Sequence, residues 1–187
     1  MKFTAGHAAF DGKEIIPEED SKEVFAYFGL AIHVSNVLEH GVANAVFVAR
    51  LLPNIRGYAN SEAWSQAIDA HFEHMFSLTY GNMIRELEKT DSYSDVLIER
   101  LWETKRTRDR LVHHFQREAA DLMLTRIGRQ KMIAEYDKII DEFSLADRLV
   151  EEEIAPIRRS IGASDEWLNE AFESGLKRII DGEGESE

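Results

Sequence analysis

Apolar residues recur at helical spacing from about Ser21 to Leu52, and this run stops immediately before Pro53. Proline has no backbone N–H and its ring clashes with the preceding turn, so a helix usually ends before it. We therefore predict a long first helix over residues 21–52. The helical spacing continues along the chain, and we find no segment in which apolar and polar residues alternate as in a strand.

Three more long helices and one short helix follow from the same pattern. We expect them over residues 61–88, 92–125, 129–154 and 164–180. Their boundary signals are Asn60 or Ser61 as an N-cap, Ser92 opening the third helix, Gly128 as a break, and Pro156 ending or kinking the fourth helix. The expected fold class is all-α, an up-down helical bundle of four long helices plus a short C-terminal helix.

The chain length of 187 residues suits one sizeable core, and we find no internal repeat and no long linker. We expect a poorly ordered N-terminal segment over residues 1–20, a single helical-bundle domain over residues 21–181, and an acidic tail over residues 182–187. The tail, Gly-Glu-Gly-Glu-Ser-Glu, has no apolar residue to bury, which favours disorder.

Composition excludes several classes of function. A net charge of −13 opposes non-specific coating of nucleic acid, although it allows one local basic groove. The absence of cysteine excludes disulfides and thiolate chemistry, so a catalytic site would have to use His, Arg, carboxylates or hydroxyls. The N-terminus has no apolar signal core, and polar residues interrupt the most apolar region, residues 25–52. We expect a cytoplasmic protein without a membrane span.

The residues best suited to chemistry gather between Lys105 and Phe115, within the third expected helix. This run contains Lys105, Arg106, Arg108, Asp109, Arg110, His113 and His114. Within it, Arg108, Asp109 and His113 have the spacing Arg-Asp-x-x-x-His. Arginine binds phosphate well and histidine exchanges protons near neutral pH, so a function is expected here. The spacing leaves open a simpler interpretation, a basic helix face whose histidines are ordinary surface groups.

Helical angles divide this run between two faces. At about 100° per residue, Arg108 lies in the apolar stripe that faces the core, whereas Asp109 and His113 lie in a second apolar strip with Trp102. A helix that is apolar on two sides needs two partners, and we expect a second copy of the chain to be one of them. A core-facing arginine also needs an anion; Glu39 is the candidate, unless Glu39 simply reaches solvent.

These residues resemble the motif of the HEPN superfamily of small α-helical bundles. Its hallmark is Arg, a polar Asn, Asp or His, three to five further residues, and then His; Arg108-Asp109-Arg110-Leu111-Val112-His113 fits with Asp in the polar position. The segments at residues 27–31, 38–44 and 108–129 also resemble a group of uncharacterised bacterial HEPN-like proteins. The resemblance covers about residues 21–160, and only its Arg–His motif is functionally specific.

The resemblance implies a metal-independent endoribonuclease without a cofactor, acting as a homodimer whose two motifs meet in an interface cleft. Such proteins often act in toxin–antitoxin or phage-defence systems, which implies RNA and a cognate antitoxin or nucleotidyltransferase as partners. By this resemblance, Arg108 stabilises the phosphoryl transition state, His113 is general base or acid on the 2′-hydroxyl, and Asp109 orients His113. The RNA strand would be steered by Lys105, Arg106 and Arg110, with His114 as an auxiliary group.

Two alternatives stay open. Many members of this superfamily have lost catalysis, so the chain could be an inactive HEPN-like dimer that acts as an interaction or nucleotide-binding module. The second alternative is a metal-binding helical bundle. His71 and His74, with His33, Glu39 and His113, could in principle hold a metal ion, although the chain lacks the Glu-x-x-His motif of di-iron bundles.

Overall fold

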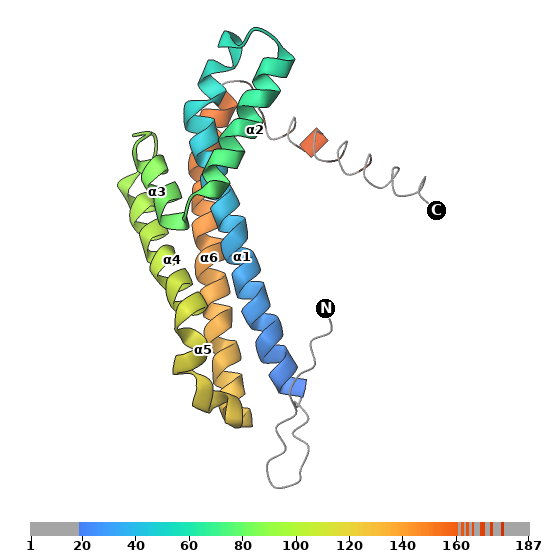
Figure 1. Cartoon of the computed structure of the whole chain (residues 1–187), viewed down its shortest axis with the longest axis vertical. Coiled ribbons are helices and arrows are strands. Elements are labelled where there is room, and N and C mark those ends of the chain that lie inside the picture. Colours follow the sequence, from blue (N-terminus) through green and yellow to red (C-terminus); the bar gives the residue numbers. More distant parts are fainter. Residues whose placement is uncertain are drawn as a thin grey trace. The chain divides into compact units, whose positions relative to one another are not determined.

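The computed structural model describes residues 19–160 without interruption, and seven single positions between residues 162 and 177. Within these residues the chain is all-α and contains no strand (Figure 1). The expected terminal segments, apart from residues 19 and 20, lie outside the described residues, as does most of the helix expected over residues 164–180. No helix in the described part has an apolar stretch long enough to cross a bilayer.

Eight helical elements follow one another in the described residues. In order, they are α1 (Glu19–Arg50), the 3-10 helix η1 (Leu52–Gly57), α2 (Ser61–Ser77), α3 (Tyr80–Glu88), α4 (Asp95–His113), α5 (Phe115–Glu118), the 3-10 helix η2 (Ala120–Leu124) and α6 (Arg126–Ser160). The first predicted helix is confirmed to within two residues at each end.

The second predicted helix is wrong in one respect, because it is divided into α2 and α3. Asn60 caps α2 as predicted, its side chain accepting a hydrogen bond of 2.9 Å from the Ala63 amide. At Leu78 and Thr79 the backbone becomes extended, with ψ angles of 157° and 155°. Serine, threonine and glycine are all weak helix formers, and they gather here at positions 77, 79 and 81. The break therefore has a local cause.

The third predicted helix is also interrupted. It starts at Asp95 rather than Ser92, because Ser94 is the cap: its hydroxyl oxygen accepts a hydrogen bond of 3.2 Å from the Leu97 amide. It ends at His113, and His114 leaves the helical conformation with φ −127° and ψ −37°. The short elements α5 and η2 occupy the rest of the segment predicted to be one helix.

The predicted break between the third and fourth helices lies at Thr125, whose backbone is extended, rather than at Gly128, which lies inside α6. A Cβ atom at this position would lie 2.1 Å from the Leu122 carbonyl oxygen of η2, so the backbone of η2 approaches too closely for any residue but glycine. Pro156 does not end the last helix either, since α6 continues through it to Ser160.

The chain divides into two compact units. Unit 1 comprises α1 up to Asn36 and residues 106–143, which include the end of α4, α5, η2 and the first half of α6. Its core is built around the buried ring of Tyr136, which lies 4.8 Å from the Phe115 ring and 5.8 Å from the Phe28 ring. These contacts join α1, α5 and α6 within the unit.

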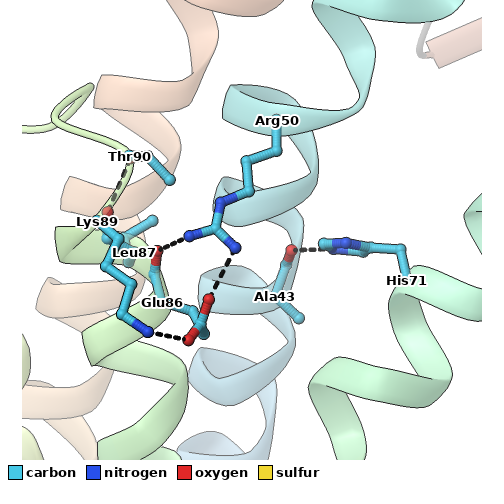
Figure 2. Close-up of polar contacts among 7 residues, drawn as sticks. All are labelled: Ala43, Arg50, His71, Glu86, Leu87, Lys89 and Thr90. Atoms are coloured by element: carbon cyan, nitrogen blue, oxygen red, sulfur yellow. Dashed lines mark hydrogen bonds and ion pairs between the residues drawn. The ribbon is translucent and has the colours of Figure 1, made fainter.

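Unit 2 comprises residues 37–105 and α6 from Ser144. Figure 2 shows some of the polar contacts within this unit. Nη1 of Arg50 on α1 donates to the Glu86 carboxylate of α3 at 2.7 Å, and Nη2 donates to the Glu86 carbonyl at 3.0 Å. Lys89 contacts the same carboxylate at 2.6 Å. Hydrogen bonds from Lys89 and then Arg50 hold the pKa of Glu86 below its ordinary value.

A close approach of α1 and α6 is a second feature of unit 2. A Cβ atom added to Gly41 would lie 2.8 Å from the Asp147 carboxylate and 3.7 Å from Val150, so the helices meet at this glycine. The Asp147 side chain is half-buried there. Burial, and then the nearby negative charge of Glu151, raise the pKa of Asp147.

Candidate functional site

The residues of the expected site belong mainly to unit 1. Arg106, Arg108, Asp109 and Arg110 lie on the last turns of α4, His113 is its final residue, and His114 joins α4 to α5. Lys105 and Glu39 belong to unit 2, where both side chains are half-buried. The pairing of Arg108 with Glu39 stays a prediction.

The side chains of the motif differ in their exposure to solvent. Arg108 and Asp109 are half-buried, whereas Arg106, His113 and His114 are exposed. His113 is exposed because α4 ends at this residue and the chain then turns at His114. The imidazole that is expected to exchange a proton is therefore open to a ligand from solvent.

Packing and one hydrogen bond hold the end of α4 in place within unit 1. Leu111 and Phe115 are buried on either side of the two histidines. Thr107 lies on α4 before the histidines, and its hydroxyl donates a hydrogen bond of 3.0 Å to the Glu142 carboxylate of α6. These contacts give the exposed histidines a rigid base, which a site for a small reacting group requires.

The two histidines lie side by side, and an arginine that the sequence motif does not include contacts one of them. The ring centroids of His113 and His114 are 6.3 Å apart with an interplanar angle of 71°. Nη2 of Arg117 lies 3.1 Å from Nδ1 of His114. A guanidinium can only donate, so Nδ1 of His114 accepts and its ring proton is placed on Nε2. His114 then presents an N–H donor, beside the remaining donors of the exposed Arg117.

Arg117 is a residue that the sequence interpretation missed. It follows His114 by three positions, which is the spacing at which side chains on a helical turn meet. That spacing was the available signal. The short α5 helix carries Arg117 on an exposed turn, so that both the histidine and the arginine stay open to solvent.

Arg110 is engaged by carboxylates of its own unit. Its guanidinium lies 3.1 Å from Glu118 and 3.4 Å from Glu135, and 5.5 Å from the centre of the Phe115 ring. The hydrogen bond that Arg110 donates to Glu118 is the main cause that raises the pKa of Arg110. A phosphate would have to compete with two carboxylates for this residue. Beside it lies an open hollow of about 310 Å³, whose apolar lining includes Phe115, Leu122 and Met132.

The second apolar strip of α4 is covered in part by the chain itself. In unit 2, the indole N–H of Trp102 donates a hydrogen bond of 2.7 Å to Glu88, and the Arg85 guanidinium lies 5.8 Å from the centre of the Trp102 ring. Gly81 of α3 approaches the same ring closely. The short helix α3 therefore contacts α4 at Trp102, which stays half-exposed, and the second copy expected at this strip stays a prediction.

The histidines considered for a metal site have separate environments. Nε2 of His71 lies 3.2 Å from the Ala43 carbonyl oxygen (Figure 2), and its ring packs against Phe47 and Phe72. Burial is the main cause that lowers the pKa of His71. His74 is exposed. Among the described residues, no three His, Cys, Asp or Glu side chains are grouped in a way that could hold a metal ion.

Comparison with known proteins assigns no function to this site. The chain matches no protein-family model, no curated protein and no solved structure. A function for the site has to be argued from its own residues.

Proposed function

We propose that the chain is a HEPN-like, metal-independent endoribonuclease that acts as a homodimer. The observation that carries this proposal is the pair of exposed imidazoles of His113 and His114, 6.3 Å apart at the end of α4, with Arg117 bound to the second ring. Two imidazoles and a guanidinium supply the proton exchange and the positive charge that cleavage of a phosphodiester by its own 2′-hydroxyl requires.

The proposed reaction is an internal transfer of the phosphoryl group. His113 takes the proton of the 2′-hydroxyl, the 2′-oxygen attacks the adjacent phosphorus, and the bond from phosphorus to the 5′-oxygen breaks. The leaving 5′-oxygen lies on the side of phosphorus opposite His113 and takes a proton from water, and the imidazolium of His113 gives its proton to the hydroxide so formed, so the products are a 2′,3′-cyclic phosphate and a 5′-hydroxyl. Arg108, together with Nε2–H of His114 and Arg117, would stabilise charge on the non-bridging oxygens. Asp109 would orient His113.

A second candidate function is a catalytically inactive HEPN-like dimer that binds a partner protein or a nucleotide. The contacts of Arg110 with Glu118 and Glu135 favour it, because they place two carboxylates beside the region that RNA would occupy. The net charge of −13 also favours this second function, because it opposes the approach of a polyanion such as RNA.

Cleavage of end-labelled RNA in the presence of EDTA tests the first function. The comparison is between the wild-type chain, Arg108→Ala and His113→Ala, with Gln130→Ala as a matched control, because Gln130 is exposed on α6 of the same unit. We expect wild type and control to give products with a 2′,3′-cyclic phosphate and the two site variants to lose cleavage. Equal cleavage by all four proteins would contradict the proposal. Absence of cleavage with all four proteins, together with binding of a partner protein or a nucleotide, would favour the second candidate function.

The proposal extends to the setting of the protein. The described helices would belong to an up-down bundle of four long helices plus a short C-terminal one, in a cytoplasmic protein of a toxin–antitoxin or phage-defence system. Induced expression should then arrest growth in the wild-type form and not in His113→Ala. Co-expression with a cognate antitoxin or nucleotidyltransferase should relieve the arrest.

A further inference from the structure

The exposed face of α1 in unit 1 carries no charged side chain from Phe25 onward. Six residues form this face, here called the neutral face of α1: Phe25, Ala26, Gly29, Leu30, His33 and Asn36, all of them exposed. At about 100° per residue they fall within an arc of roughly 140°, so they form one continuous surface. Phe25 and Leu30 remain 56% and 45% exposed although they are large and apolar.

The other long helix of unit 1, α6, carries charged residues on its exposed surface, as is usual for a helix that faces solvent. The exposed charged residues of α6 in unit 1 are Arg126, Lys131, Asp137, Lys138 and Asp141. In contrast, α1 has a single charged residue between Val24 and Ala49, which is the half-buried Glu39. An exposed helix face that lacks charge over more than three turns is typical of a surface that another molecule covers.

The shape of the neutral face suits close packing against a helix. Its two large side chains, Phe25 and Leu30, lie at opposite edges of the arc, and Ala26 and Gly29 lie between them. A Cβ atom added to Gly29 would meet nothing within 4 Å, so the space above this backbone is open to a partner. His33 and Asn36 are neutral and can both donate and accept hydrogen bonds, so that each can pair with a polar group of a partner.

We propose that the neutral face of α1 is the surface through which two copies of this chain form a dimer. The net charge of the chain favours a second copy as the molecule that covers this face. Two chains that each carry a net charge of −13 repel one another, and a symmetric contact brings a surface against an identical surface, so that any net charge on it is opposed by the same charge. A neutral surface avoids that repulsion. RNA is disfavoured as the occupant, since the neutral face offers no cation to a phosphate.

This inference does not depend on the ribonuclease proposal. It names a different surface from the second strip of α4, which α3 contacts at Trp102. A dimer through α1 is compatible with an inactive His113, which is the second candidate function. The oligomeric state therefore tests the dimer surface on α1, and the activity tests the ribonuclease proposal.

The absence of cysteine from the chain permits a direct test by single-cysteine disulfide mapping. The variants Ala26→Cys and Gly29→Cys place a thiol on the neutral face, and Ala134→Cys places one on the exposed surface of α6 in the same unit. Under mild oxidation we expect the first two proteins to form disulfide-linked dimers within the time in which Ala134→Cys stays monomeric. Equal crosslinking of all three, or none in any, would overturn the proposal.

A charge substitution at the same face gives an independent measurement on the full-length chain. In Leu30→Glu, two carboxylates would oppose each other across the symmetric contact, and we expect the dimer dissociation constant to rise about 100-fold or more. Ala134→Glu is the control and should dimerise as wild type does. Sedimentation velocity gives the oligomeric state and circular dichroism the helix content. A wild-type chain that is monomeric at all accessible concentrations, or a dimeric and folded Leu30→Glu, would overturn the proposal.

Discussion

Arg117 donates a hydrogen bond of 3.1 Å to Nδ1 of His114, across one turn of the short helix that follows α4. This contact fixes which ring nitrogen of His114 carries the proton, and it leaves the Nε2–H group for a ligand. Both side chains are exposed, so a ligand could reach them without any change of the core.

The first prediction concerns this hydrogen bond. In Arg117→Ala we expect RNA cleavage to fall about tenfold, less than for a buried oxyanion donor because this site is open to water. Nitrogen-15 NMR of the histidine rings provides a readout besides activity: the Nδ1 resonance of His114 should differ between wild type, where Arg117 donates a hydrogen bond to this nitrogen, and the variant. Lys131→Ala, another exposed cation of unit 1, is the control. An unchanged Nδ1 resonance of His114 in Arg117→Ala would show that the contact does not form in solution.

The second prediction follows from the half-buried Asp147 beside Gly41. Burial raises its pKa above the ordinary value of 3.8, so the folded state holds the proton more tightly than the unfolded state does. The free energy of unfolding therefore falls as the pH rises from 3.8 through the raised pKa of Asp147. We expect Asp147→Asn, which is always neutral, to raise Tm at neutral pH by about 1 to 3 °C. Scanning calorimetry should show the difference shrinking toward pH values below 3.8; a constant difference would argue against ionisation as its cause.

The third prediction concerns acid sensitivity at His71. Burial lowers its pKa below 6.5, so the unfolded state binds the proton more readily. Stability contributed by the neutral ring is present above this pH and is lost as the pH falls below it. We expect the urea midpoint to fall between about pH 7.5 and about pH 5.5 by on the order of 0.2 M more in wild type than in His71→Gln. His74→Gln, with its exposed ring, should behave as wild type; an equal change in both variants would exclude His71 as the source.

The fourth prediction tests the close approach of η2 and α6. A methyl group at position 128 would overlap the Leu122 carbonyl, which is backbone and cannot rotate away. We expect Gly128→Ala to lower the free energy of unfolding by about 1 to 3 kcal/mol. Urea denaturation measures this loss, and Gly57→Ala is the control because a Cβ there meets nothing within 4 Å. Full stability in Gly128→Ala would mean that η2 does not lie on α6 in this way.

Sequence periodicity predicts the all-α class and the bounds of α1 because those depend on local patterns. Pro53 ends the first helical run, and Asn60 has the side chain that a helix start needs. The division of the third predicted helix is harder to predict, since it depends on residues distant in the chain. The segment after His114 is α5 and η2 rather than one helix, and η2 returns onto α6 at Gly128.

The candidate site is predictable only in part for the same reason. Residue types and spacing select Arg108, Asp109 and His113, and helical angles place Arg108 apart from His113. The carboxylate contacts of Arg110 come from Glu118 and Glu135, eight and 25 positions away, across a turn that periodicity does not reveal. The contact between Arg117 and His114 follows ordinary helical spacing, but the motif that directs attention to the segment ends at His113.

The close approach of η2 and α6 at Gly128 restricts how this chain can diverge during evolution. Because the Leu122 carbonyl occupies the place of a side chain, a descendant that keeps this approach has to keep glycine at this position. The exposed positions of η2, such as Asp121 and Leu124, carry no such restriction. Relatives that keep η2 on α6 should therefore have glycine at the position of Gly128, even where the exposed residues of η2 share no identity.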